Sequence, residues 1–437
     1  MPFCWRSLRI KVSAPRSFTK TGVPERSLSR LIRVPGEFSM TKKDVFQSYD
    51  QFVFQTYARM PLVLVKGKGS VVTDIDGHKY LDFFPGWGVS NTGHCHPKVM
   101  AAVRDQVGKL IHVPNNFYHP NQGRLAREIV RHSFDGKVFF CNSGAEANEA
   151  AIKLARIYGQ GKRHGIITAL TSFHGRTMGA LAATGQLKYQ EGFAPLLSGF
   201  THVPFNDFAA VRAAVNADTV AIMLELVQGE GGINIASQSY VQSLRQLCNE
   251  KDILLIVDEV QTGMGRTAKM FAYQHYGIEP DIMTLAKGLG GGMPIGAMLA
   301  ARRFSGLLQP GMHGTTFGGS PIVTKAALGV FEAIQKDKML PNARVMGEYL
   351  LARLALLQKE CALIKEVRGL GLMVGVELHT DGKPVFDDCL AHGLIINCTQ
   401  KRVLRLMPAL NVTRKQIDKA LLILAAALNR VVVEKTG

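Results

Sequence analysis

The chain has 437 residues, enough for two or three domains, and its 46% hydrophobic and 20% charged residues are ordinary for a globular protein. No apolar run reaches the roughly 18 residues that span a membrane, and seven scattered cysteines without a Cys-x-x-Cys pair argue against a disulfide framework or a zinc ribbon and suit a reducing compartment. The net charge is +18, but no nucleic-acid recognition motif accompanies it, so we do not expect the protein to bind nucleic acid. We also expect it to bind no membrane and no metal ion.

Residues 1–39 differ in composition from the rest of the chain. They are rich in Arg, Ser and Pro, lack apolar periodicity and carry +6 of the net +18. This composition resembles a mitochondrial presequence, which would place the protein in the matrix. Alternatively, residues 36–37 can be back-translated as a purine-rich ribosome-binding sequence two codons before Met40, which would then be the true start, with residues 1–39 an upstream region read as protein. We favour the second explanation and a cytoplasmic protein, and in either case we expect residues 1–39 to form a disordered extension.

The chain from Met40 onward has the pattern of a folded protein in three parts. In the N-terminal segment, residues 40–90, turn signals at 66–69 and 76–77 flank a strand expected at 70–74. In residues 91–324, strands and helices alternate, which predicts a large α/β domain with a mostly parallel sheet. Its strands are expected at 138–141, 165–170, 220–225, 253–258, 282–285 and 296–300, with helices at 146–158 and 240–250 between them.

Residues 325–437 predict a smaller α+β C-terminal domain. A long helical stretch leads to a glycine-punctuated strand pattern at 367–377. Strand patterns at 394–397 and 403–406 follow, and then a helix begins at Arg414.

Two of the predicted strands lead into side chains that carry chemistry. The apolar run 253–257 ends in Asp258, at the sheet edge where ligands of open α/β sheets bind, although a strand-end Asp that caps a helix is an equal alternative. The strand at 282–285 leads to Lys287 and a glycine-rich turn, which a planar ligand can approach closely. A partly desolvated lysine has a lowered pKa and becomes nucleophilic; the alternative is a surface lysine beside a flexible loop. The glycine spacing argues against a nucleoside-triphosphate loop.

Two further segments add an anion site and an aromatic face. Ser143, Gly144 and Ala145 open a helix whose free N–H groups suit a phosphate, although an ordinary Ser cap is the alternative. Phe173 and Arg176 offer a ring and a guanidinium, or else a core Phe and a solvated Arg. Together the four segments favour a flat, phosphorylated cofactor that bears an aldehyde.

These segments carry a family resemblance that extends from about residue 40 to the end of the chain. The motifs are residues 93–97, 143–148, 173–177, 228–232, 258–266 and 313–319. With them the chain resembles the class III pyridoxal-phosphate aminotransferases of fold type I. It is most similar to their acetylornithine branch, and the ornithine branch is close behind.

The resemblance implies a site for pyridoxal 5′-phosphate. Its residues are Ser143, Gly144, Ala145, Phe173, Asp258, Val260, Gln261, Lys287 and Thr316. Lys287 is expected to hold the cofactor as a Schiff base and to carry the proton, and Asp258 is expected to keep the ring nitrogen protonated. Gln261 is expected to bond the ring hydroxyl, and Phe173 and Val260 to sandwich the ring. Thr316 is expected to reach the phosphate of a partner subunit, which implies a homodimer with the active site at the interface.

The resemblance also implies substrate residues for small amino and oxo acids. Arg405 is expected to bind the α-carboxylate of glutamate, and Glu230 to pair with Arg405 while the ω-amine donor is bound. Arg176 is expected to bind the distal carboxylate of glutamate, or the α-carboxylate of an ornithine-type donor. Trp87 departs from the aliphatic residue or tyrosine usual in the family, and with Tyr57 it is expected to line the donor channel. Core packing is the alternative for both aromatics.

The implied reaction moves the δ-amino group of N-acetylornithine to 2-oxoglutarate. It gives N-acetylglutamate 5-semialdehyde and glutamate, a step of arginine biosynthesis. The alternatives are ornithine or 4-aminobutyrate as donor. An aminomutase is disfavoured because Arg405 provides for a second dicarboxylate that a mutase need not bind.

Overall fold

The computed structural model describes residues 40–436, and the expectations for residues 1–39 lie outside this range. The chain divides into one unit that ends at Met60 and another that begins at Pro61. In the first unit, helix α1 (Lys42–Phe52) begins with a reciprocal cap. The Thr41 hydroxyl accepts from the Asp44 N–H at 3.2 Å, and the Asp44 carboxylate accepts from the Thr41 N–H at 2.8 Å. The described part of the first unit is therefore a capped helix followed by residues 53–60, which form neither helix nor strand.

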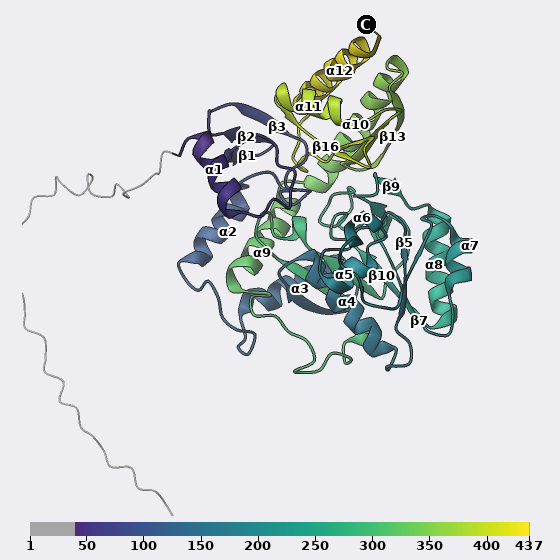
Figure 1. Cartoon of the computed structure of the whole chain (residues 1–437). Coiled ribbons are helices and arrows are strands. Elements are labelled where there is room, and N and C mark those ends of the chain that lie inside the picture. Colours follow the sequence, from purple (N-terminus) through teal and green to yellow (C-terminus); the bar gives the residue numbers. More distant parts are fainter. Residues whose placement is uncertain (1–39, 437) are drawn as a thin grey trace, which may run out of the picture. The chain divides into compact units, whose positions relative to one another are not determined.

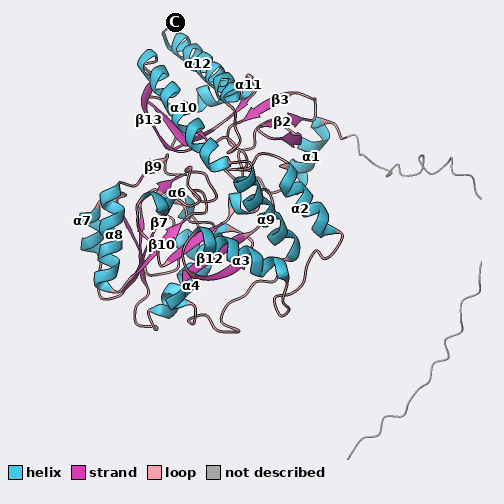
Figure 2. Ribbon diagram, turned by 180° about the vertical axis from the view of Figure 1, so that it is seen from behind, coloured by secondary structure: helices cyan, strands magenta, loops and turns pink. Residues whose placement is uncertain are grey.

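The second unit is built around a seven-stranded sheet (Figures 1 and 2). Its order is β4 (Gly136–Cys141), β12 (Gly296–Ala301), β11 (Ile282–Leu285), β10 (Leu254–Asp258), β7 (Thr219–Leu224), β5 (Gly165–Ala169) and β6 (Phe200–Val203). Only β12 runs antiparallel to its neighbours, so the expected α/β fold with a mostly parallel sheet is confirmed. All six expected strands are present. The edge strand β6 was missed because its sequence, Phe-Thr-His-Val, is short and half polar.

Burial explains the apolar runs of the central strands. Every residue of β7, β10, β11 and β12 is buried, as expected for strands covered on both faces. Helix α4 (Gly144–Tyr158) packs along five strands, from β4 to β7, and α8 (Gln238–Lys251) packs on β7 and β10. The remaining helices of this part are α2 (Pro97–Val107), α3 (Pro120–His132), α5 (Met178–Ala183), α6 (Leu187–Gln190), α7 (Phe208–Ala214) and α9 (Pro321–Lys336).

A second, antiparallel sheet lies in the C-terminal part of the chain (Figure 1). Its order is β13 (Ile364–Leu370), β14 (Met373–Leu378), β17 (Val403–Leu406) and β16 (Asn397–Thr399), and α10 (Met339–Glu360) packs on it. Helices α11 (Lys383–Ala391) and α12 (Arg414–Thr436) pack together beside it. The glycine-punctuated pattern at 367–377 is thus a hairpin, because Gly371 has φ +59° between its two strands.

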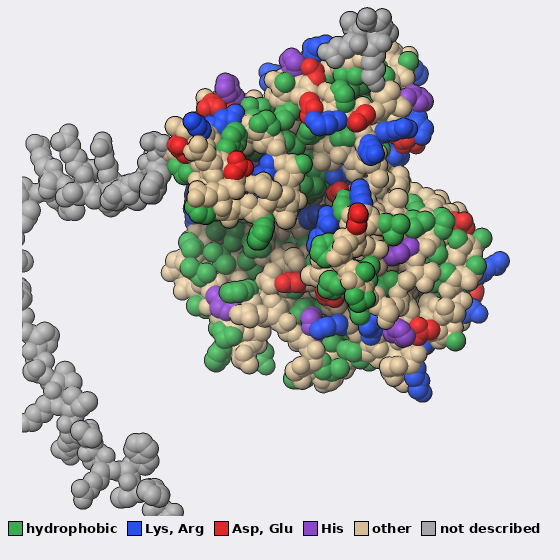
Figure 3. Space-filling model, viewed as in Figure 1, with side chains coloured by type: hydrophobic (Ala, Val, Ile, Leu, Met, Phe, Trp, Pro, Cys, Tyr) green, Lys and Arg blue, Asp and Glu red, His purple; other side chains and the backbone are tan. Residues whose placement is uncertain are grey.

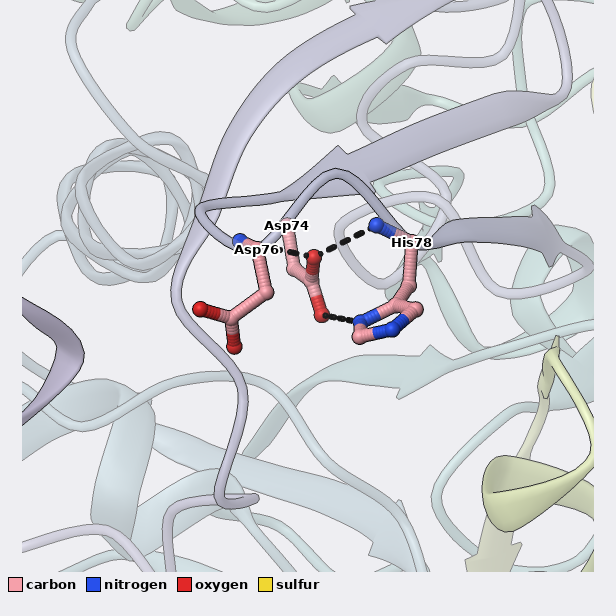
Figure 4. Close-up of side chains that lie close together, drawn as sticks. All are labelled: Asp74, Asp76 and His78. Atoms are coloured by element: carbon pink, nitrogen blue, oxygen red, sulfur yellow. Dashed lines mark hydrogen bonds and ion pairs between the residues drawn. The ribbon is translucent and has the colours of Figure 1, made fainter.

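A third sheet joins the two ends of the second unit. Strands β1 (Leu64–Lys68), β2 (Val71–Asp74) and β3 (Lys79–Asp82) form a meander, and β15 (Leu394–Ile395) pairs parallel to β3. A ribbon of β8 (Val227–Gln228) and β9 (Asn234–Ile235) completes the strands. The β2–β3 turn brings Asp74, Asp76 and His78 together (Figure 4). Asp74 Oδ1 accepts from the N–H groups of Asp76 and His78 at 3.0 and 2.8 Å, so this carboxylate stabilises the turn.

Glu259 stabilises the long segment that follows β10 by hydrogen bonds. Its buried carboxylate accepts from the Tyr273 N–H at 2.8 Å and from the Thr262 hydroxyl at 2.5 Å. Burial raises the pKa of Glu259 to about 7, against the hydrogen bonds, which lower it. The folded protein therefore binds a proton at Glu259 more tightly than the unfolded chain does.

This difference predicts a pH-dependent stability. A carboxyl group whose pKa rises on folding destabilises the protein progressively as the pH rises from its ordinary pKa of 4.5 to about 7. Glu259→Gln cannot ionise, and its amide can still accept from the Tyr273 N–H and donate to the Thr262 hydroxyl, so the fall in Tm between about pH 5 and pH 8 should be smaller in this variant. The exposed Glu360→Gln is the matched control. Identical Tm-against-pH curves for Glu259→Gln and wild type would show that Glu259 does not contribute.

Candidate active site

The register of two neighbouring strands places the two main candidate groups at one sheet edge. Strands β10 and β11 are parallel, and Asp258, the last residue of β10, pairs with Thr284. Lys287 follows three residues after Thr284, at the start of a 3-10 turn. Both side chains therefore lie at the carboxyl edge of the sheet, where α/β proteins bind ligands.

A pocket of about 430 Å³ lies at this edge. Figure 3 shows acidic and basic side chains around a hollow between the part with the seven-stranded sheet and the part with α10 to α12. The pocket collects most of the expected site residues. Its walls include Ser143, Gly144, Ala145, Phe173, Arg176, Glu230, Asp258, Val260, Gln261 and Lys287.

Asp258 is buried and held by three donors. Its Oδ2 lies 2.8 Å from His174 Nδ1 and accepts from Asn148 Nδ2 at 2.8 Å, and its Oδ1 accepts from the Val260 N–H at 2.9 Å. Burial is the largest influence and acts to lower the pKa of His174, but the hydrogen bond to Asp258 and the negative charges of Asp258 and Glu225 together outweigh it, so the pKa is raised. His174 and Asn148 thus fix the carboxylate in one orientation.

Lys287 provides an amine in the same pocket. Burial lowers its pKa below the ordinary value, although Glu230, Asp258 and Glu225 act in the opposite direction. Among the residues that the structure describes, Lys287 Nζ has no hydrogen-bond or ion-pair partner. A lysine with a lowered pKa and a free Nζ is suited to nucleophilic attack on a carbonyl group. Its backbone has φ +40°, a left-handed conformation that is uncommon outside glycine and is often found at functional sites.

The start of α4 forms an anion cradle in the pocket wall. Ser143 is the N-cap, and its Oγ accepts from the Glu146 N–H at 3.2 Å. The N–H groups of Gly144 and Ala145 lie in the first turn, where a helix has no internal acceptors. A Cβ on Gly144 would lie 2.7 Å from Val260 Cγ1, so only glycine lets Val260 approach the cradle this closely. Ser143 is therefore a cap, as the simpler interpretation held, at the edge of an open anion site.

Two other wall residues suit a flat polar ring. Phe173 lies on one side of the pocket, and its backbone N–H is fixed by Glu225 Oε2 at 2.9 Å. Gln261 is buried, and its Oε1 has no hydrogen-bond partner within the described part of the chain. A buried amide oxygen without a partner is costly unless a ligand supplies a donor.

The two expected substrate arginines differ in how they are partnered. Arg405, on β17, is buried; its Nη1 donates to Glu230 Oε1 and to the Gly229 carbonyl, both at 2.9 Å, and its Nε to Asn397 Oδ1 at 2.7 Å. Arg176 is exposed at the pocket wall and has no hydrogen-bond or ion-pair partner among residues 40–436. One guanidinium is thus neutralised, and the other is available.

Four expected residues lie outside the pocket wall, and the paired Arg405 is one of them. Trp87 is 49% exposed and packs edge-on against Phe84 with 6.1 Å between ring centroids, and Phe84 lies 4.7 Å from the Arg405 guanidinium. Thr316 is exposed in the loop before α9. Tyr57 belongs to the N-terminal unit, where its exposed ring lies 5.9 Å from the Arg59 guanidinium.

Sequence reasoning missed three buried polar residues of the site. His174 and Asn148 stood inside motifs already quoted, and a search for partners of Asp258 would have suggested them. Glu225 follows β7 as Asp258 ends β10, so the same strand-end signal applied. Its carboxylate accepts from the N–H groups of Phe173 and Gly229 at 2.9 and 3.3 Å, and burial raises its pKa to about 7.

Comparison with known families agrees with this geometry. Residues 53–428 match the family model of the class III aminotransferases. An acetylornithine aminotransferase from Caldanaerobacter subterraneus subsp. tengcongensis is 50% identical over 386 residues, which cover 87% of this chain and 98% of that protein. One from Methanocaldococcus jannaschii is 49% identical over 387 residues, covering 87% of this chain and 96% of that protein.

Solved structures share the fold. An ornithine aminotransferase from Toxoplasma gondii, with pyridoxal phosphate at partial occupancy in its active site, has a TM-score of 0.88 and 32% identity and covers 91% of this chain and 96% of its own. An acetylornithine aminotransferase from Elizabethkingia anophelis has a TM-score of 0.80 and 29% identity, covering 90% of this chain and 100% of its own.

Proposed function

The chain belongs to the class III aminotransferases, and we propose that it transfers the δ-amino group of N-acetylornithine to 2-oxoglutarate. The observation that carries this proposal is the contrast between the two site arginines. Arg405 is paired with Glu230 at 2.9 Å, whereas Arg176 has free donors at the pocket wall. Such a site can bind a donor with one carboxylate and, once Glu230 moves, an acceptor with two.

Class III aminotransferases use pyridoxal 5′-phosphate, and the pocket fits it. The cradle of Gly144 and Ala145 would hold the phosphate, and Phe173 and Val260 would cover the ring. Gln261 Oε1, which lacks a protein partner, would accept from the ring hydroxyl. When bound, the cofactor supplies an electron sink beside the carbon that carries the amino group.

Two residues do the chemical work of the protein. Asp258, held by His174 and Asn148, would keep a proton on the ring nitrogen of the bound cofactor. Lys287 Nζ, with its pKa lowered by burial, would hold the cofactor and would move the proton at the substrate carbon.

The surroundings of Arg176 favour an acylated donor over free ornithine. The α-carboxylate of either donor would bind the Arg176 guanidinium. In ornithine the positively charged α-ammonium group would then lie near the Arg176 guanidinium, and the two charges would repel each other. No carboxylate of the described chain pairs with Arg176 to offset this repulsion. Acetylation removes that positive charge.

We propose a cytoplasmic homodimer with its active site at the subunit interface. The exposed position of Thr316, away from the pocket of its own chain, supports a role in the cofactor site of the partner subunit.

The proposal predicts an order of donors. With 2-oxoglutarate as acceptor, kcat/KM should be at least roughly tenfold higher for N-acetylornithine than for ornithine, N-succinylornithine or 4-aminobutyrate. Initial rates of glutamate formation test this, and reactions without 2-oxoglutarate are the control. A preference for ornithine or 4-aminobutyrate would replace the proposed donor, and isomerisation of a donor without 2-oxoglutarate would indicate a mutase.

A second prediction concerns Trp87 as a determinant of donor choice. Trp87→Ile removes a large ring beside Phe84 and should change the N-acetylornithine-to-ornithine ratio of kcat/KM by about 1–3 kcal/mol. Trp87→Phe, which keeps an aromatic ring, should change the ratio less. If Trp87→Ile leaves the ratio unchanged, Trp87 serves packing alone.

A further inference from the structure

To bind a carboxylate, the Arg176 side chain must be held in place while its N–H groups stay free. An arginine side chain has many rotamers, and an exposed one keeps this freedom until a contact or a ligand orders it. Arg405 is ordered by acceptors, which occupy its Nη1 and Nε. Arg176 has no such acceptor among the described residues, yet it lies at the pocket wall.

Tyr189 supplies the contact that orders Arg176. The Arg176 guanidinium carbon lies 4.0 Å from the centroid of the Tyr189 ring and 5.7 Å from that of Phe173. The two rings meet edge to face, at 5.7 Å and 84°. A guanidinium on a ring face is held by the cation–π attraction, while the N–H groups around its edge remain available to a carboxylate.

The helix that carries Tyr189 is tied to the site by hydrogen bonds of the residue before it. Tyr189 lies on the short helix α6, which follows Gln186. Gln186 Nε2 donates to the Ser172 carbonyl at 3.0 Å, next to Phe173, and its Oε1 accepts from Gln400 Nε2 at 3.1 Å. Gln400 Nε2 also donates to the Glu230 carbonyl at 2.8 Å. The helix is thus tied both to the loop of Phe173 and to the backbone of the residue that pairs with Arg405.

We propose that Tyr189 is a positioning residue that holds Arg176 ready for the substrate carboxylate and so sets substrate affinity. This inference rests on the proposed function, in which Arg176 binds a carboxylate in both halves of the reaction. Tyr189 acts through Arg176 and has no part in the proton transfers at Lys287. Its loss should therefore raise KM and leave kcat nearly unchanged.

The test is a double-mutant cycle on the holoenzyme. Tyr189→Leu removes the ring face, and Tyr189→Phe keeps it. Tyr189→Leu should weaken binding of glutarate, a five-carbon dicarboxylate without an amino group, about fivefold in calorimetry and raise the KM for glutamate equally. Tyr189→Phe should stay near wild type. In an Arg176→Gln background, Tyr189→Leu should have no further effect.

Controls distinguish an effect on the position of Arg176 from an effect on folding, and they do not depend on which amine donor the enzyme uses. Lys188→Ala removes the other cation on this ring, 4.8 Å away, and should leave glutarate binding unchanged. Tm and the visible cofactor band should match wild type in every variant. Three results would each overturn the inference. Tyr189→Leu could bind glutarate as tightly as wild type, or Tyr189→Phe could lose as much glutarate affinity as Tyr189→Leu. Tyr189→Leu could also cause its full loss of glutarate affinity in the Arg176→Gln background. Glutarate binding does not depend on the amine donor, so N-acetylornithine can fail as substrate while the role of Tyr189 stands.

Discussion

The parallel pairing of β10 with β11 is the constraint on which the site depends. It aligns the end of β10 with Thr284, and so it brings Asp258 and Lys287, 29 positions apart in the sequence, to one edge of the sheet. The strands can hold this register because every residue in both is buried under helices. A slip of one residue would turn alternate side chains to the other face and separate the acid from the amine.

Electrostatics around this edge follow from burial and pairing together. The charge of Asp258 is tolerated because His174, Asn148 and a backbone N–H bond it directly. Lys287 has no such partner, so burial lowers its pKa. Arg405 is buried with Glu230, while Arg176 stays exposed on aromatic rings. The pocket wall therefore holds one fixed acid, one reactive amine and one free arginine, and the second arginine is paired with the wall residue Glu230.

Much of this could be predicted from the sequence. Continuous apolar runs located six of the seven strands, and the chemical groups at their ends located Asp258 and Lys287. Features that depend on tertiary contacts could not be read in this way. Tyr189 and Gln400 meet the site only through the folded chain, and no spacing rule links them to Arg176. The pairing of β15 with β3, more than 300 residues apart, likewise has no local signal.

The most direct test of the central claim is to map where the cofactor is attached. Borohydride reduction of the holoenzyme, followed by proteolysis and mass spectrometry, should find the pyridoxyl group on the peptide that contains Lys287. Lys287→Ala should retain cofactor through the phosphate cradle and ring contacts but show no covalent label and no turnover. A label on another lysine in the wild-type protein, or labelling of Lys287→Ala at the wild-type level, would contradict the account.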